Sequence, residues 1–114
     1  MELDHDIKGD VLVITPAEPR IDAAVAIQFK DGMRTLTQDA GGRVVLDLRR
    51  VDFVDSSGLG AIVGAMKQLG GQARLELASL TPNVAKVFRL TRMDTVFTIH
   101  DSADHALQAA ASHG

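Results

Sequence analysis

The sequence predicts an α/β fold: a mixed, mostly parallel β-sheet with an antiparallel edge and about four helices. Apolar blocks of strand length alternate with amphipathic segments of helix length along the 114 residues. The connections between most of these blocks are long enough to join parallel strands. Because 46% of the residues are hydrophobic, the chain can supply one core, and we expect a single domain over residues 1–114.

The first predicted element is an antiparallel hairpin. Residues 3–7 alternate weakly, residues 8–10 supply a turn, and residues 11–15 form a β-branched run. Pro16 and Pro19 cannot extend a central strand, so the chain is expected to leave the sheet there.

A first helix is expected to begin near Ala23, with Asp22 able to cap it. Its apolar residues recur every three or four positions and so share one face: Val25, Phe29, Met33 and Leu36. Gly41 and Gly42 end this segment.

The middle of the chain predicts a central strand followed by the main helix. Residues 43–48 are an apolar block without clean alternation, as expected of a parallel strand covered on both faces. The strongest helical periodicity follows at Leu59, Ile62, Val63, Met66 and Leu69.

The last third of the sequence predicts two more strands and two more helices. Residues 73–78 alternate as a strand, and Thr81 before Pro82 is typical of a helix start. Residues 95–100 are rich in β-forming types, and Asp101 or Ser102 can cap a final helix.

Composition excludes several classes of function. The formal charge is −3 without a basic cluster, so a direct nucleic-acid partner is not expected. The chain has no cysteine, no signal peptide and no apolar span of membrane length, which favours a cytoplasmic setting without membrane insertion. The histidines show no metal-ligand spacing, and no cofactor motif is intact, so we expect neither a metal nor a cofactor.

The junction between the central strand and the main helix carries the candidate chemistry, at residues 55–60. A hydrolase elbow, G-x-S-x-G, would need glycine where Val54 or Asp55 stands, although His100 could serve as a base. A dinucleotide-binding loop fails as well, because the glycine spacing from Gly58 is one residue too long. We therefore do not expect an enzyme.

Two interpretations of the junction remain open from the residues alone. A phosphoryl group on Ser56 or Ser57 would lie against the positive end of a helix, where free amides and the dipole favour an anion. Alternatively, Asp55 and the serines only cap the helix.

The run Asp55-Ser56-Ser57-Gly58-Leu59-Gly60 after an apolar block resembles the signature of the STAS domain in bacterial anti-sigma factor antagonists. The likeness covers nearly the whole chain and implies the family's fold, a single STAS-like domain with a mixed sheet and helices mainly on one side. It also implies a phosphoacceptor at Ser56, with Ser57 as the alternative. Ser57 would hold the helix end and Asp55 would position the acceptor. The run and Asp22 together would contact the partner.

The same resemblance implies a partner switch. The unphosphorylated domain would bind an anti-sigma factor serine kinase, a GHKL-type ATPase, and release its target, while phosphorylation would end binding. A metal-dependent serine phosphatase would reverse the reaction. Pro19 and Arg20 depart from the family's glycine and acid before Asp22, which concerns the partner contact. A STAS subunit that scaffolds a lipid-transport or transporter complex without phosphorylation is the alternative.

Overall fold

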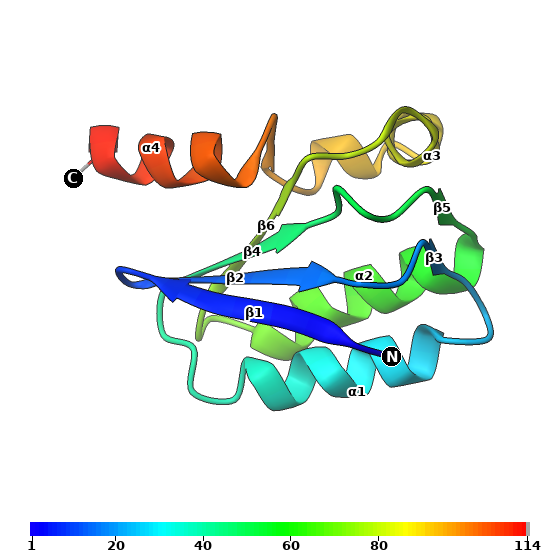
Figure 1. The fold of residues 1–114 in the computed structure, drawn as a ribbon, viewed down its shortest axis with the longest axis horizontal. Helices are drawn as coiled ribbons and strands as arrows, with labels where there is room; N and C mark the ends of the chain where they lie inside the picture. Colours follow the sequence, from blue (N-terminus) through cyan, green and yellow to red (C-terminus); the bar gives the residue numbers. More distant parts are fainter. Residues whose placement is uncertain (114) are drawn as a thin grey trace.

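The computed structural model describes the backbone of residues 1–113 and the side chains of residues 1–109. A central sheet separates α1 and α2 on one side from α4 on the other (Figure 1). In chain order the elements are β1 (Leu3–Lys8), β2 (Val11–Pro16), β3 (Arg20–Ile21), α1 (Ala26–Leu36), β4 (Arg43–Asp47), β5 (Phe53–Val54), α2 (Ser56–Leu69), β6 (Arg74–Ala78), α3 (Pro82–Leu90), the 3₁₀ helix η1 (Met93–Thr95), β7 (Ile99–His100) and α4 (Ala103–His113).

The main sheet has the order β1-β2-β4-β6-β7. β1 is antiparallel to β2, and every other neighbouring pair is parallel. The predicted fold class is therefore confirmed, including the single antiparallel edge. Long crossovers through α1 and α2 make the central pairs parallel, while the tight turn at Gly9, with φ +65°, allows the hairpin.

The core lies mainly between the sheet and the first two helices. Alternate strand residues such as Leu46 and Leu77 point into it, where they meet Phe29 of α1 and Ile62 of α2. α3 contributes Phe88 to the same cluster. A smaller cluster under α4 fills the opposite face, as expected when a sheet is covered on both sides.

A buried ion cluster also ties α4 to the sheet. Glu76, 2% exposed, accepts hydrogen bonds from Arg43 Nε at 2.8 Å and Nη2 at 2.7 Å. His100 Nε2 lies 2.6 Å from the same carboxylate, and Arg43 Nη2 also donates to the Ala106 carbonyl of α4 at 3.0 Å. The hydrogen bonds from Arg43 lower the pKa of Glu76 although burial opposes the shift.

The structure corrects the predicted strand over residues 95–100. Met93–Thr95 is a 3₁₀ helix, and only Ile99 and His100 pair with β6. The reason is Phe97, which turns into the core and packs edge-to-face on Phe88 with ring centroids 6.0 Å apart. Packing of one aromatic ring thus overrides a local preference for extended chain.

The start of the first helix also differs from the prediction. α1 begins at Ala26 rather than near Ala23, since residues 23–25 form a turn in which Val25 N–H donates to Asp22 O at 3.1 Å. The Asp22 side chain accepts the Ala24 N–H at 3.1 Å. Asp22 therefore caps the turn before α1 and not α1 itself.

A second, two-stranded sheet was not predicted. β3 pairs in parallel with β5, matching Arg20 with Phe53 and Ile21 with Val54. The Phe53 amide also lies 3.3 Å from the Pro19 carbonyl. This short sheet brings the turn before α1 beside the junction before α2.

Candidate functional site

The predicted junction lies where β5 ends and α2 begins, and Asp55 organises it. Asp55 is the N-cap of α2, with extended backbone, and its Oδ1 accepts the Gly58 N–H at 2.8 Å. Its Oδ2 accepts the Ala23 N–H at 3.1 Å. One carboxylate therefore ties the start of α2 to the turn before α1, two segments far apart in the sequence.

The two serines are the first residues of α2, and both are exposed. Neither hydroxyl makes a hydrogen bond within the described part of the chain. The role of holding the helix end, which the resemblance gave to Ser57, belongs instead to Asp55. Both hydroxyls are consequently accessible to a second protein.

Gly58 allows α2 to pack directly against the backbone of β3. A Cβ at this position would stand 1.8 Å from the Ile21 carbonyl oxygen and 2.7 Å from its carbon. Gly60 differs, because a Cβ there would meet nothing within 4 Å. Leu59 packs against the core between them. Of the two glycines in the run, one is required by packing and the other lies on an open surface.

Asp22 directly follows β3 as Asp55 directly follows β5, so both lie at the same end of the short parallel sheet. Its Oδ2 accepts Arg20 Nε at 3.2 Å, and the Arg20 guanidinium lies 4.3 Å from the centre of the Phe53 ring. The structure thus brings Asp22 and the run 55–60 together, since Ala23 bonds to Asp55. Sequence reasoning missed Phe53 and noted Arg20 only as a departure from the family's pattern, although a phenylalanine two residues before the motif was a usable signal. The structure shows that Phe53 is exposed beside Arg20.

The arrangement offers an anion a positive end of a helix rather than a reactive centre. The Gly58 and Leu59 amides are already bonded to Asp55, so the amides of Ser56 and Ser57 are the ones left at the helix start. His100, the base that the hydrolase hypothesis needs, is hydrogen-bonded to Glu76 beneath α4. Among the described residues, no basic side chain is hydrogen-bonded to the hydroxyl of either serine.

Among the described side chains, no three histidine, aspartate or glutamate residues come together as a metal site would require. No helix in the described part of the chain has both the length and the apolar character needed to cross a bilayer.

Removing the Asp55 carboxylate is expected to loosen the junction. Asp55→Ala loses the cap on Gly58 and the bond to Ala23, which should lower the free energy of unfolding by about 1–2 kcal/mol. Urea denaturation measures the change. Asp52→Ala is the matched control, because the exposed Asp52 side chain makes no bond in the described residues, and its effect should stay within about 0.5 kcal/mol. Equal effects of the two substitutions would contradict the bridging role of Asp55.

Comparisons with known proteins agree with this geometry. A family model described as the STAS domain matches residues 2–106. A Bordetella bronchiseptica protein named as an anti-sigma factor antagonist, BtrV, is 32% identical over 110 residues, which cover 96% of this chain and 94% of that protein.

Solved structures show the same fold. An anti-sigma-factor antagonist (STAS) domain protein from Planctomyces limnophilus matches with a TM-score of 0.86 and 25% identity, over 96% of this chain and 97% of its own. The antagonist SpoIIAA in its unphosphorylated form gives a TM-score of 0.77 at 22% identity, over 97% of both chains. The phosphorylated form of the Bacillus protein SpoIIAA matches with a TM-score of 0.68 and 21% identity, over 96% of this chain and 99% of its own.

Proposed function

Because this chain belongs to the STAS domain family of anti-sigma factor antagonists, we propose that it works as a phosphorylation-controlled partner switch. In its unphosphorylated form it binds an anti-sigma factor that is also a serine kinase and so releases that kinase's target. Phosphorylation of Ser56 ends the binding. A metal-dependent serine phosphatase restores the binding form.

The observation that carries this proposal is the state of Ser56. Its side chain is exposed, its hydroxyl has no partner within the described residues, and it occupies the first position of α2. A kinase can reach such a hydroxyl without unfolding the domain. The position directly after Asp55 is what selects Ser56, since Ser57 is equally exposed and remains the alternative acceptor.

A phosphoryl group at Ser56 is compatible with the folded domain but would weaken the binding of a partner over the same surface. It would add about −1.5 to −2 charges beside the positive end of α2, where the dipole stabilises an anion. A partner bound over the same surface would have to accommodate that charge and the carboxylates of Asp22 and Asp55 near it. A loss of about 2.8 kcal/mol is enough to weaken binding a hundredfold.

The relatives support both the binding of an anti-sigma factor and the phosphorylation that we propose. The Bordetella relative is named for antagonism of an anti-sigma factor, which is a binding activity. SpoIIAA, which shares the fold, has been solved with and without phosphate, so a fold of this kind accepts the modification. We propose that the contact surface comprises Asp22, Asp55, Ser56, Ser57, Gly58, Leu59 and Gly60. The exposed members of this set offer most of the contact, while Gly58 shapes the surface from beneath.

The proposal also specifies which classes of partner the domain requires. The kinase would be a GHKL-type ATPase, and neither a nucleic acid nor a cofactor is required. The domain would serve as substrate and ligand and not as an enzyme, in the cytoplasm. A single domain over residues 1–114 is sufficient for this role.

The phosphorylation assay tests the acceptor. Incubation with ATP and the GHKL-type serine kinases of the native organism, each purified, should add one phosphate to the wild-type chain, as seen by intact mass. Ser56→Ala should abolish the addition, and Ser57→Ala, the matched control one residue away, should leave it intact. Phosphorylation of Ser56→Ala at the wild-type stoichiometry would show that another residue is the acceptor.

A binding assay tests the switch itself. Ser56→Asp should keep the fold but bind the kinase at least about tenfold more weakly, because a carboxylate brings part of the phosphate's charge to the interface. Calorimetric titration measures the affinity, with Ser57→Ala as reference. If the fully phosphorylated chain binds as tightly as the unmodified one, the surface is a constant docking site, as in the scaffold alternative.

A further inference from the structure

One edge of the main sheet is incompletely paired. β6 bonds to β4 along its whole length, but β7 pairs only with its last two residues. The Arg74 amide donates to Gly42 before β4, and the Leu77 amide donates to Thr98 before β7. Because successive residues of a strand alternate in direction, the amide and carbonyl of Leu75 face the β7 side, where no described strand pairs with them.

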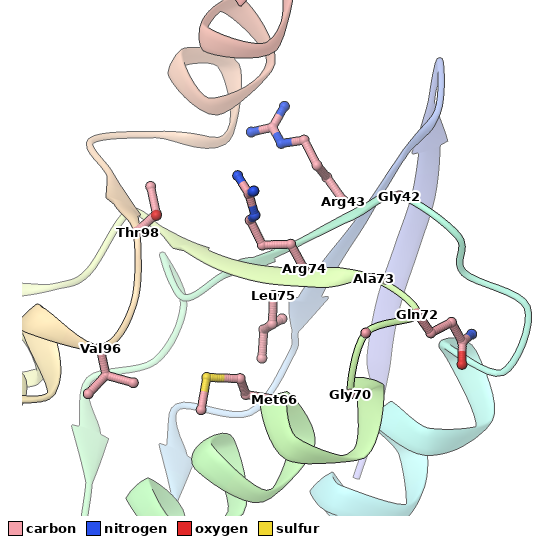
Figure 2. Close-up of a pocket in the computed structure, with 11 residues that line it drawn as sticks. Gly42, Arg43, Met66, Gly70, Gln72, Ala73, Arg74, Leu75, Val96 and Thr98 are labelled. Atoms are coloured by element: carbon pink, nitrogen blue, oxygen red, sulfur yellow. The ribbon is translucent and has the colours of Figure 1, made fainter.

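A hollow of about 770 Å³ lies beside this free edge (Figure 2). On the side of the sheet that α4 covers, the guanidinium groups of Arg43 and Arg74 border it. On the side of α1 and α2, it is lined by Met66, Leu75 and Val96, the last of which is 47% exposed. A strand added here would meet positive charge on one face and apolar side chains on the other.

The two cations have unused hydrogen-bonding capacity. Arg74 is exposed and forms no ion pair among the described residues. Arg43 spends its Nε and Nη2 on Glu76, but its Nη1 is buried without an acceptor in the described part of the chain. A buried donor without a partner costs free energy. Because Arg43 Nη1 is buried, Arg74 is the cation that an incoming carboxylate or carbonyl can reach directly.

β1, at the opposite edge of the sheet, carries the complementary pattern. Asp6 lies opposite Val13 of β2, which packs under α4, so Asp4 and Asp6 both face the α4 side. Leu3 and Ile7 face the other side, and Ile7 is 69% exposed. Lys8 shares this face at the end of β1, so the edge strand presents two carboxylates and one ammonium group. On the same face of the sheet β6 presents the exposed Arg74 and the buried Glu76, whose charge is already paired with Arg43.

A second copy of the chain in the same orientation brings these two edges together. β1 is antiparallel to the rest of the sheet, so β1 of the second copy would run antiparallel to β6 of the first. The faces then coincide, with Asp4, Asp6 and Lys8 on the side of Arg74 and Glu76, and Ile7 on the side of Val96. Because Glu76 is already paired with Arg43, the exposed Arg74 is the charge that Asp4 or Asp6 would meet. We propose that the chain associates head to tail in this way, by adding β1 of one copy to the free edge of β6 in another.

The proposed contact joins two different edges, so it is open-ended and not a closed dimer. Asp4 and Asp6 must leave Arg50 and Lys8, but these pairs are exposed and exchange readily. One short strand pair is a small interface, and we expect a dissociation constant on the order of 10⁻⁴ M. The hollow lies at the amino ends of β4 and β6, away from the junction that holds Ser56, so the association leaves the proposed switch accessible.

Sedimentation analysis of the full chain, from about 10 µM to about 1 mM to bracket that constant, tests the proposal. The average mass of the wild type should rise with concentration. Arg74→Glu should remain monomeric, as should the double variant Asp4→Lys with Asp6→Lys. Mixing these two proteins should restore association, because the exchanged charges are again opposite. Arg89→Glu, the same change on α3, is the matched control and should behave as the wild type.

Two results would overturn the proposal: a wild type that stays monomeric over the whole range, or Arg74→Glu that associates as the wild type does. Circular dichroism confirms that each variant is folded, so that loss of association is not loss of structure. Binding of a synthetic peptide of alternating aspartate and valine to a monomeric wild type, lost in Arg74→Glu, would assign the edge to a foreign acidic strand and reject self-association.

Discussion

Gly58→Ala is expected to destabilise the domain by about 3 kcal/mol or more, which is the largest effect of any substitution in the motif. The added Cβ would stand 1.8 Å from the Ile21 carbonyl oxygen, and the obstacle is backbone, not the end of a flexible side chain. Either α2 must move away from β3 or the short β3–β5 sheet must separate. Urea denaturation measures the loss, and a failure to fold is within the expected range.

Gly60→Ala is the matched control for this prediction. It places the same methyl group two residues further along α2, where nothing lies within 4 Å. Alanine favours the helix over glycine, so this variant should be more stable than the wild type by about 0.5–1 kcal/mol. The two substitutions should therefore change the free energy of unfolding in opposite directions. A Gly58→Ala variant as stable as the wild type would mean that α2 does not pack against Ile21 as described.

Glu76→Ala is expected to cost about 3 kcal/mol, because it leaves Arg43 beneath α4 without its counter-charge. His100 loses its partner at the same time. Asp31→Ala provides the comparison, since it breaks an exposed ion pair with Arg34 and should cost less than about 1 kcal/mol. Chemical denaturation at neutral pH measures the free energy of unfolding of both variants and so compares loss of the buried cluster with loss of the exposed ion pair. A loss below about 1 kcal/mol for Glu76→Ala would contradict the structural role of the cluster.

The same carboxylate predicts a loss of stability in acid. Hydrogen bonds from Arg43 lower the pKa of Glu76 from its ordinary value of 4.5, with a further contribution from His100. A carboxyl whose pKa is lower in the folded state stabilises that state above pH 4.5, and the contribution disappears as the pH falls through the folded-state pKa. Glu76→Gln should therefore narrow the difference in unfolding free energy between neutral and acidic pH. An unchanged pH dependence would show that other groups control acid unfolding.

Sequence patterns located the candidate site but not its internal roles. Residues 55–60 were identified because a strand-like block meets a helical period there, which is local information. The sequence did not show which side chain caps the helix. Asp55 holds that position because its carboxylate reaches both Gly58 and Ala23, and the second contact depends on how distant segments fold together. The role that the resemblance gave to Ser57 was wrong for this reason.

By itself the sequence determined the hairpin, the three central parallel strands, the four helices and the place where the motif lies, because spacing of apolar residues is set by the backbone period of each element. Only the tertiary structure decided that β3 and β5 pair, that Gly58 touches Ile21, and that the turn of Phe97 into the core removes the first part of the strand predicted over residues 95–100. A two-residue strand is too short to show a period, and contacts of this kind arise when remote segments compete for the same core.

The run of residues 55–60 shows both kinds of information. Its serines could be read from the chain as accessible hydroxyls at a helix start, and the structure agrees. In the sequence, Gly58 was considered only for the spacing of a nucleotide-binding loop, whereas the packing of α2 on β3 requires a glycine at this position. Sequence fixes what a residue can do locally, and the fold decides which of those possibilities the neighbouring backbone allows.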